Sequence, residues 1–421
     1  MVAVLCACSV VSFIDRQIIS LLVEDLRRDL GLSDTAIGLL QGLSFALFYA
    51  VCAVPLGRLA DASNRKRLIA AGMCVWSGAT ALCGLAGNFV QLFCARMLVG
   101  AGEATLTPST YSMLADLFRP TRLALPCGVY AGSSFVGSGM ALLLGGMILG
   151  YLAQSGPVVL PGIGELRNWQ AAFLGAALLS SVVIVLFVVT IDEPVRRGLQ
   201  GPRADSRPPL RELVAFYRAN RRTLNAVFFG VSLLGAAQFA IGAWAPAYFM
   251  RLHGWSAAQA GTAYGSILLA CGTAGSIAGG WLADRLEASR GKGHLRAALV
   301  SALATLPFAM AFPLAPNGSW VVALLVPTVF FGSLSLGAGP ALIPVFAPPR
   351  MRAVLIAAYL FAASLLGQAM GPALVGLSTD YLFGAPARVR ESLVLVPATL
   401  LILAALFLWS GIRVKRRSAV S

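Results

Sequence analysis

The segment Gly57-Arg58-Leu59-Ala60-Asp61-Ala62-Ser63-Asn64-Arg65-Lys66-Arg67 joins two long apolar stretches of the chain. It places one acid and then three consecutive cations in a short connection, which must lie outside hydrocarbon because charges are costly there. A shorter version returns in the second half of the chain as Gly280-Trp281-Leu282-Ala283-Asp284-Arg285. This recurrence predicts an architecture of two related halves.

The composition is that of a protein that spans a membrane. Of the 421 residues, 58% are hydrophobic and 12% are charged, and the mean hydropathy is +0.80. A water-soluble protein of this length needs more charge to cover its surface. The apolar residues come in blocks of about 20, the length of helix that crosses roughly 30 Å of hydrocarbon. Open β-sheet is excluded because lipid leaves unpaired backbone groups unsatisfied.

The predicted fold class is therefore an all-α membrane protein with twelve transmembrane helices, arranged as two six-helix pseudo-repeats. The expected spans are 2–24, 36–58, 67–87, 89–114, 122–150, 169–190, 223–249, 257–283, 296–315, 319–346, 353–377 and 392–411.

The distribution of cations orients the chain. With the N-terminus inside, 24 of the 32 Lys and Arg residues fall in cytoplasmic connections and the tail, and six fall in outer connections. Short loops rich in Lys and Arg stay in the cytoplasm, so both termini are expected there. The net charge of +15 is thus an orientation signal, and no nucleic-acid partner is expected.

The halves are related by a shift of 223 residues, at which eight identities occur without a gap over 31 positions. The longest polar connection, 191–222, separates an N-terminal bundle, 1–190, from a C-terminal bundle with a short cytoplasmic tail, 223–421. Within the connection, Leu210 to Tyr217 predicts a short interfacial helix. The identities pair Gly31, Ser33, Gly38, Gly42, Gly57, Leu59, Ala60 and Asp61 with Gly254, Ser256, Gly261, Gly265, Gly280, Leu282, Ala283 and Asp284. Two parallel repeats indicate a transporter with a site between its halves.

These residues resemble the major facilitator superfamily. The segment from Gly57 to Arg67 is similar to that family's signature between helices 2 and 3, and Arg96 to Glu103 resembles its helix-4 motif. Phe13-Ile14-Asp15-Arg16, together with Glu103, resembles the spinster-like branch. The resemblance implies alternating access, usually driven by protons, and lysolipid or sphingoid-lipid export in animals. The fifth span lacks the Gly-Pro step of the family's antiporter motif, so the direction of transport stays open.

Four ionisable residues fall well inside predicted spans, where a charged side chain is costly unless it has a structural or functional role. Arg96 and Glu103 are seven residues apart and share one helix face, whereas Asp15 and Arg16 point about 100° apart and cannot simply pair. We expect a charge network between helices 1 and 4, made of Asp15, Arg16, Arg96 and Glu103. The network is interpreted as a proton switch, with Glu103 as the carrier. The alternative is a fixed structural salt network.

The Gly57 to Arg67 turn is interpreted as a gating latch rather than a substrate contact, because it lies outside the cavity. Asp61 is expected to meet a helix N-terminus or an arginine of the other half. Arg65, Lys66 and Arg67 are expected to face the anionic inner leaflet. The alternative is a segment that only sets topology. The predicted latch residues are Gly57, Asp61, Arg65, Lys66, Arg67, Asp284 and Arg285.

The substrate site is expected among polar and aromatic residues deep in the spans, although such residues often serve helix packing. Arg16 is suited to an anionic head group. Aromatic residues, one arginine and little other charge favour an amphipathic, lysolipid-like anion. Multidrug efflux and proton symport of organic acids or sugars are alternatives. The candidate contacts are Tyr130, Ser134, Gln238, Trp244, Tyr359 and Gln368.

An enzyme is not expected, because the two histidines, His253 and His294, fall on opposite sides of the membrane and no catalytic or Walker constellation appears. The eight cysteines fall within apolar segments without a C-x-x-C pair, so they are interpreted as packing residues. No metal or other cofactor is expected. A passive channel or lipid scramblase is a remote alternative. The apolar start of the chain is interpreted as helix 1 rather than a signal peptide. We expect a monomer in a bacterial inner (plasma) membrane, in contact with substrate, protons and lipids.

Overall fold

The computed structural model describes residues 1–118, 124–155, 158–160, 164–195, 210–290, 292–335, 343 and 347–413. Eleven helical segments of this part are long and apolar enough to cross a membrane, and Gly318–Ser333 is a shorter apolar helix. This is in keeping with the twelve predicted spans. The start of the fifth span, the end of the tenth, and 196–209 of the central connection lie outside the described residues.

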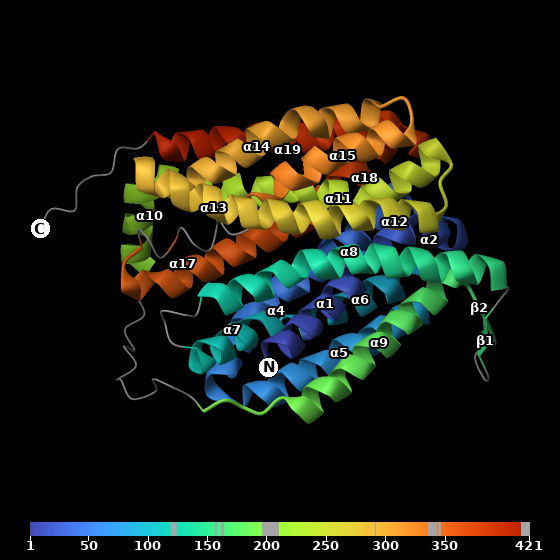
Figure 1. The fold of residues 1–421 in the computed structure, drawn as a ribbon, viewed down its shortest axis with the longest axis horizontal. Helices are drawn as coiled ribbons and strands as arrows, with labels where there is room; N and C mark the ends of the chain where they lie inside the picture. The colour runs from blue at the N-terminus through green and yellow to red at the C-terminus, as the bar shows by residue number, and fades with distance from the viewer. Residues whose placement is uncertain are drawn as a thin grey trace, which may run out of the picture.

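Six of the candidate spans lie between Val2 and Thr190, and Figure 1 shows their helices packed side by side. The helices of the N-terminal half are α1 (Val2–Gln17), η1 (Ile18–Leu21), α2 (Val23–Leu30), α3 (Asp34–Gln41), α4 (Leu43–Ala62), α5 (Arg65–Gly84), α6 (Phe89–Glu103), α7 (Leu106–Leu117), α8 (Ala124–Ser155) and α9 (Asn168–Thr190). A small antiparallel hairpin of β1 (Val158–Leu160) and β2 (Gly164–Leu166) follows α8.

The C-terminal half repeats the arrangement. Its helices are α10 (Leu210–Asn225), η3 (Ala226–Val231), α11 (Ser232–His253), α12 (Ala257–Ile267), η4 (Leu268–Gly272), α13 (Thr273–Arg290), α14 (Gly293–Ala311), η5 (Phe312–Leu314), α15 (Gly318–Ser333), α17 (Pro349–Ala362), η6 (Ala363–Ala369), α18 (Met370–Leu377), η7 (Ser378–Phe383), η8 (Pro386–Arg388) and α19 (Val389–Ile412).

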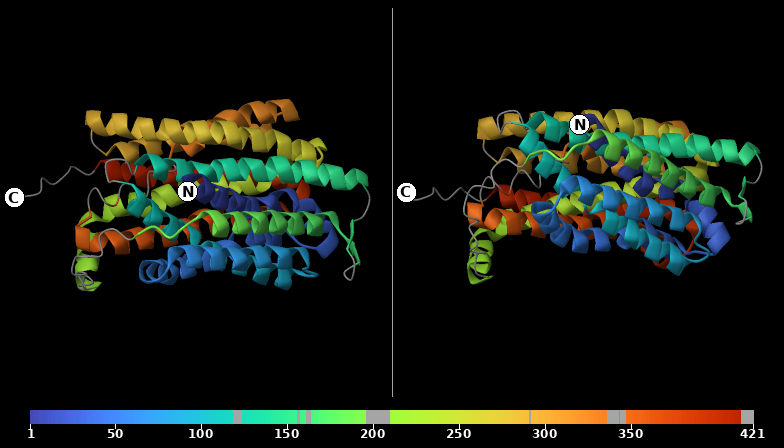
Figure 2. Two further views of the ribbon diagram at one scale, coloured as in Figure 1. Left: turned by 60° about the horizontal axis from the view of Figure 1, so that its bottom comes forward. Right: turned by 90° about the horizontal axis from the view of Figure 1, so that it is seen from below.

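Helix α10 lies across one end of the bundle while the long helices run lengthwise (Figures 1 and 2). The same end holds the connection between α4 and α5 and most of the described Lys and Arg residues. We call it the cation-rich side, and the end that carries β1 and β2 the opposite side. The helix predicted from Leu210 to Tyr217 is present and runs on to Asn225, with a kink at Asn220.

The repeated residues of the sequence occupy equivalent places in the two halves. Gly31 and Gly254 end α2 and α11 with φ angles of 64° and 65°, a left-handed conformation that glycine adopts without strain. Ser33 and Ser256 then cap the next helix, each accepting a hydrogen bond from a backbone N–H three residues on. The repeat thus encodes the same helix–turn–helix on the opposite side of each half.

The glycines that follow bring the halves together on the opposite side. A Cβ added to Gly38 would lie 2.6 Å from the Pro372 carbonyl oxygen, and one added to Gly265 would lie 2.7 Å from the Gly139 carbonyl oxygen. Backbones can approach this closely only where side chains are absent. Helix α3 therefore packs on α18, and α12 packs on α8.

At the cation-rich side the equivalent glycines make no such contact. No described atom lies within 4 Å of a Cβ built on Gly280, and Gly57 has only the Pro108 Cβ, at 3.9 Å. Gly128 and Gly132, at the start of α8, also have no described neighbour within 4 Å. The described parts of the halves therefore meet on the opposite side and separate on the cation-rich side.

Candidate functional site

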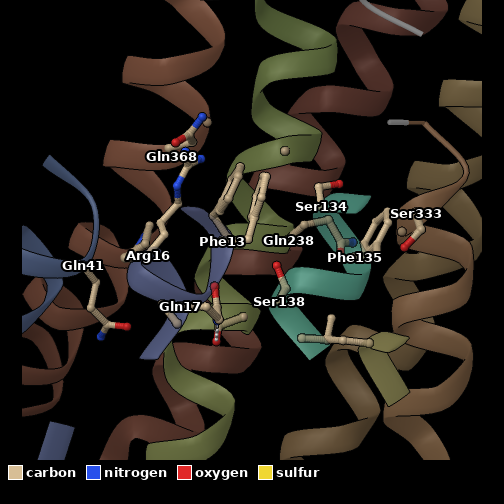
Figure 3. A pocket seen from close by; sticks show the side chains of 18 of the residues that line it. Phe13, Arg16, Gln17, Gln41, Ser134, Phe135, Ser138, Gln238, Ser333 and Gln368 are labelled. Carbon is tan, nitrogen blue, oxygen red and sulfur yellow. Dashed lines mark hydrogen bonds between the residues drawn. The ribbon is translucent and has the colours of Figure 1, made fainter. Parts of the chain in front are cut away.

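A cavity of about 360 Å³ lies between the two halves, walled by helices of both. Its lining is mostly apolar, with phenylalanines contributed by both halves and a minority of polar side chains. Figure 3 shows Arg16, Gln41, Gln238 and Gln368 on different helices around this space.

Arg16 is the charged side chain among the residues that line this cavity. Its side chain is 14% exposed, and its guanidinium carbon lies 4.1 Å from the ring centroid of Phe45 and 4.6 Å from that of Phe13. Stacking on aromatic faces holds a cation in place in a poorly solvated site. Arg16 is thus fixed in the wall with part of its guanidinium open to the cavity.

Behind Arg16 lies Glu103. Arg16 Nη2 donates to Glu103 Oε2 over 2.5 Å, and Ser12 Oγ donates to the same oxygen over 2.6 Å. The Glu103 side chain is fully buried, and its other oxygen, Oε1, has no hydrogen-bond partner among the described residues. A buried carboxylate with one unsatisfied oxygen is a costly group that its arginine stabilises. The predicted connection between helices 1 and 4 is therefore this ion pair between α1 and α6.

Arg96 and Asp15 complete the cluster in an unexpected way. Arg96 Nη1 donates over 3.0 Å to the backbone oxygen of Asp15, not to its carboxylate. The Asp15 carboxylate instead accepts from Ser180 on α9, over 2.8 Å. Asp15 and Arg96 are fully buried, so neither reaches the cavity. Asp15 and Arg16 each find a partner on a neighbouring helix, as their different directions from α1 required.

The candidate substrate contacts divide into two groups. Two of them lie away from the lining. Trp244 is buried and donates to the Pro372 carbonyl oxygen over 3.0 Å, while Tyr130 packs edge-on against Tyr111 at 5.4 Å between ring centroids. The four that line the cavity are Ser134, Gln238, Tyr359 and Gln368.

Three carboxamides in the wall have buried atoms without partners. Gln41 Nε2, Gln238 Nε2 and Gln368 Oε1 make no hydrogen bond to any described residue. They come from α3, α11 and η6 and surround the same cavity (Figure 3). Gln238 lies over Gly332, where any side chain would collide with it. Unpaired polar groups of this kind favour a cargo that accepts or donates hydrogen bonds.

Arg65 lies elsewhere than expected. It is 1% exposed and bonds Asp116 over 2.5 Å and Glu193 over 2.8 Å. The expectation that it faces the inner leaflet is wrong, because Asp116 at the end of α7 and Glu193 just after the end of α9 supply two carboxylates that the sequence of the turn does not reveal. Lys66 donates from its backbone N–H to Glu193 over 2.7 Å, and Arg67 is exposed.

The other predicted latch residues make few contacts in this conformation. Asp284 is exposed, and the Arg285 guanidinium lies 5.1 Å from the Trp281 ring centroid within its own helix. The side chain of Asp61 lies outside the described residues. The latch role stays a prediction.

An ion cluster that was not predicted from the sequence joins the halves on the opposite side. Arg251 at the end of α11 bonds Asp34 on α3 over 2.6 Å and Glu24 on α2 over 2.6 Å. Asp380 of η7 accepts from the backbone N–H groups of Asp34 and Thr35 over 3.3 and 2.7 Å. These partners are more than 200 residues apart, and all fall near predicted span ends. We call Arg251, Glu24, Asp34 and Asp380 the clasp.

Comparison with known proteins agrees with this geometry. The family model of the Major Facilitator Superfamily matches residues 5–372. An MFS-type efflux pump of Mycolicibacterium smegmatis is 30% identical, with 99% of this chain and 93% of that protein covered. Human protein spinster homolog 1 is 28% identical, with 90% of this chain and 73% of that protein covered.

Among solved structures, a bacterial homologue of the human lysosomal transporter spinster, inward-facing and unoccupied, superposes with a TM-score of 0.81. It is 25% identical, with 97% of this chain and 96% of that chain covered. The occupied form of that homologue gives 0.78. The chain belongs to the Major Facilitator Superfamily, and it is a membrane transporter, not an enzyme. Within the superfamily it is a spinster-like transporter.

Proposed function

We propose that this chain is a secondary active transporter of an amphipathic, anionic small molecule, which it moves by alternating access and couples to protons. The observation that carries the proposal is the position of Arg16. This residue holds the buried Glu103 carboxylate on one side and lines the cavity on the other. One guanidinium therefore connects a proton-binding group with the cargo site.

The apolar lining suits the hydrophobic part of such a cargo. Phe13, Phe45, Phe135 and Phe239 surround the cavity, and Arg16 is the charged group among its lining residues. A lysolipid-like anion satisfies both features, because its head group can bind the guanidinium while its tail contacts the aromatic rings. In the proposed orientation both termini are cytoplasmic, and the described state is open toward the cytoplasm.

Multidrug efflux is the second candidate function. It is favoured by the Mycolicibacterium smegmatis relative, whose name is that of an MFS-type efflux pump. A cationic drug would have to bind beside Arg16, where like charges repel. Competition assays with an anionic lysolipid and a cationic drug separate the two functions, because the charge of Arg16 favours the former.

The test is flux in proteoliposomes with and without an imposed pH gradient. We expect gradient-driven accumulation of lysophosphatidylglycerol by the unaltered protein and none by Glu103→Gln, which retains the side-chain volume but cannot ionise. Glu165→Gln on the exposed strand β2 is the matched control. Unchanged gradient-driven flux in Glu103→Gln would contradict the coupling role. Flux that never depends on the gradient would favour a passive channel or scramblase.

A further inference from the structure

Several polar side chains in the wall of the cavity already have hydrogen-bond partners within the protein. Gln17 Nε2 donates to the Gly242 carbonyl oxygen over 3.1 Å. Because Pro246, four residues further along α11, has no N–H, that oxygen lacks its usual helical donor. Ser134 Oγ and Ser333 Oγ each donate to a carbonyl oxygen of their own helix, over 2.8 and 2.7 Å. These groups therefore need no hydrogen bond from a cargo.

The carboxamides of Gln41, Gln238 and Gln368 differ from these groups. Each has a buried nitrogen or oxygen without a hydrogen-bond partner among the described residues, and all three line the cavity from different helices (Figure 3). A cargo displaces water from such a site. It must then supply hydrogen bonds of its own, or it leaves these polar groups unsatisfied at a cost in affinity.

Local features of the fold direct two of these side chains into the cavity. Gln238 of α11 occupies space that exists because residue 332 of α15 is glycine, since a Cβ on Gly332 would collide with the amide. Tyr359 and Gln368 both line the cavity, although they are nine positions apart and would lie about half a turn out of phase on an α-helix.

The π-helix η6 removes this difference in phase. It begins after Tyr359 and contains Gln368. A π turn takes about one residue more than an α turn, so it rotates the following side chains by about 100°. Gln368 is thereby brought toward the side of the helix that Tyr359 occupies. Such turns are uncommon and often lie at functional sites.

The unpaired atoms indicate the kind of group that the carboxamides can bind. They are two donors, Nε2 of Gln41 and Nε2 of Gln238, and one acceptor, Oε1 of Gln368. A carboxylate only accepts hydrogen bonds and an ammonium group only donates them, so neither satisfies all three atoms. An ammonium group is also repelled by Arg16. A hydroxyl group donates and accepts through one oxygen, and it carries no charge that would compete for the guanidinium.

Resting on the proposed function, we propose that the head group of the anionic cargo carries hydroxyl groups, and that Gln41, Gln238 and Gln368 select the cargo by binding them. Arg16 binds the charge, and the phenylalanines of the wall contact the tail. A site built to hydrogen-bond a hydroxyl group rejects an analogue that lacks it, because the polar groups of the site are then left unpaired. The three carboxamides are thus specificity-determining residues.

The test compares two monoanionic lysolipids that differ only in the head group. Lysophosphatidylglycerol carries two free hydroxyl groups on its head-group glycerol, whereas lysophosphatidylmethanol with the same acyl chain carries a methyl group in place of that glycerol. Competition with a fluorescent lysolipid on the full chain in nanodiscs, with empty nanodiscs as background, gives both affinities. We expect lysophosphatidylglycerol to bind about tenfold more tightly.

Two leucine variants assign this preference to the carboxamides. Gln238→Leu and Gln368→Leu should each reduce it about threefold by weakening the binding of lysophosphatidylglycerol. Neither variant should weaken the binding of lysophosphatidylmethanol, which also shows that the variant is folded. Gln154→Leu, at an exposed position near the end of α8, is the matched control and should keep the full preference.

The outcomes separate this inference from the proposed function. Equal affinities of the unaltered protein for the two lysolipids would overturn the inference while leaving an anion carrier in place, and this measurement needs no variant to fold. An unchanged preference in both Gln238→Leu and Gln368→Leu would overturn the assignment to the carboxamides. Binding of neither lysolipid would overturn the proposed function as well.

Discussion

The Arg251 guanidinium lies 2.6 and 2.7 Å from the two carboxylate oxygens of Asp34, a residue of the other half of the molecule. Asp34 is 1% exposed, so this bidentate bond is shielded from water. Glu24 adds a third carboxylate oxygen at 2.6 Å from Arg251. Charge-assisted bonds with this geometry are among the strongest in proteins. They hold together the side of the molecule on which the halves meet.

Replacing Arg251 by glutamine should open that side. The change removes the cation that Asp34 and Glu24 share across the halves, and it should cost about 3 kcal/mol of interaction free energy between the halves. Spin labels at exposed Val90 and Trp320 should move apart in double electron–electron resonance, in a cysteine-free background. Arg167→Gln is the matched control, because Arg167 is paired with Asp29 inside the N-terminal half. An unchanged distance in Arg251→Gln would show that the clasp does not hold the closure.

The repeated glycines allow a pair of opposite predictions. Gly265→Val puts side-chain atoms against the Gly139 carbonyl oxygen, so it should widen the opposite side and separate the labels at Val90 and Trp320. Gly280→Val meets no described atom within 4 Å, so it should leave this conformation intact and hinder closure of the cation-rich side. We expect Gly265→Val to increase the distance between the labels. We expect Gly280→Val to leave that distance unchanged but to lose transport. The same label distances in both variants would argue against rocking of the halves.

Arg65 should be a stability residue. Removing its charge in Arg65→Gln takes away the cation that Asp116, at the end of α7, shares with Glu193, just after the end of α9. The expected loss is about 3 kcal/mol, the low end for a broken buried ion pair, because Glu193 keeps some contact with water. The apparent Tm in detergent should fall clearly, whereas Arg67→Gln at an exposed position should leave it unchanged. Equal Tm values for both variants would contradict this assignment.

Anion affinity should depend on the shape of Arg16 as well as its charge. Lysine keeps the charge but lacks the planar guanidinium that stacks on Phe45 and bonds Glu103 while facing the cavity. We expect Arg16→Lys to weaken lysophosphatidylglycerol binding about tenfold. Gln41→Leu, which removes only a neutral group from the wall, should weaken it about threefold. Microscale thermophoresis measures both, and a reversed order would place the head group away from Arg16.

Much of the architecture follows from local properties of the chain. Long apolar blocks give the helices, and the recurrence of Gly31, Ser33, Gly38 and Gly42 as Gly254, Ser256, Gly261 and Gly265 gives the relation between the halves. Helical periodicity also explains why Asp15 and Arg16 point to different neighbours. These signals act over a few residues, so they can be read without a structure.

Side-chain pairing across distant helices required the folded chain. Arg16 and Glu103 are 87 positions apart. A charge network between their helices was expected from the sequence, but the sequence did not indicate which of the four charged side chains bond each other. The partners of Arg65 and Arg251 gave no local sign, because surface and buried arginines look alike at the end of a span. Trp244 was predicted to contact the substrate because it is an aromatic residue deep in a span, yet its indole N–H donates to the Pro372 carbonyl oxygen.

By itself the sequence determined the helical membrane fold, the repeat and the presence of buried charges, because hydrophobic length, helix ends and charge cost are local quantities. Tertiary structure alone decided which charges face each other, which glycines touch the other half and which polar residues border the cavity. Those outcomes depend on how two bundles pack, and packing sums over residues hundreds of positions apart.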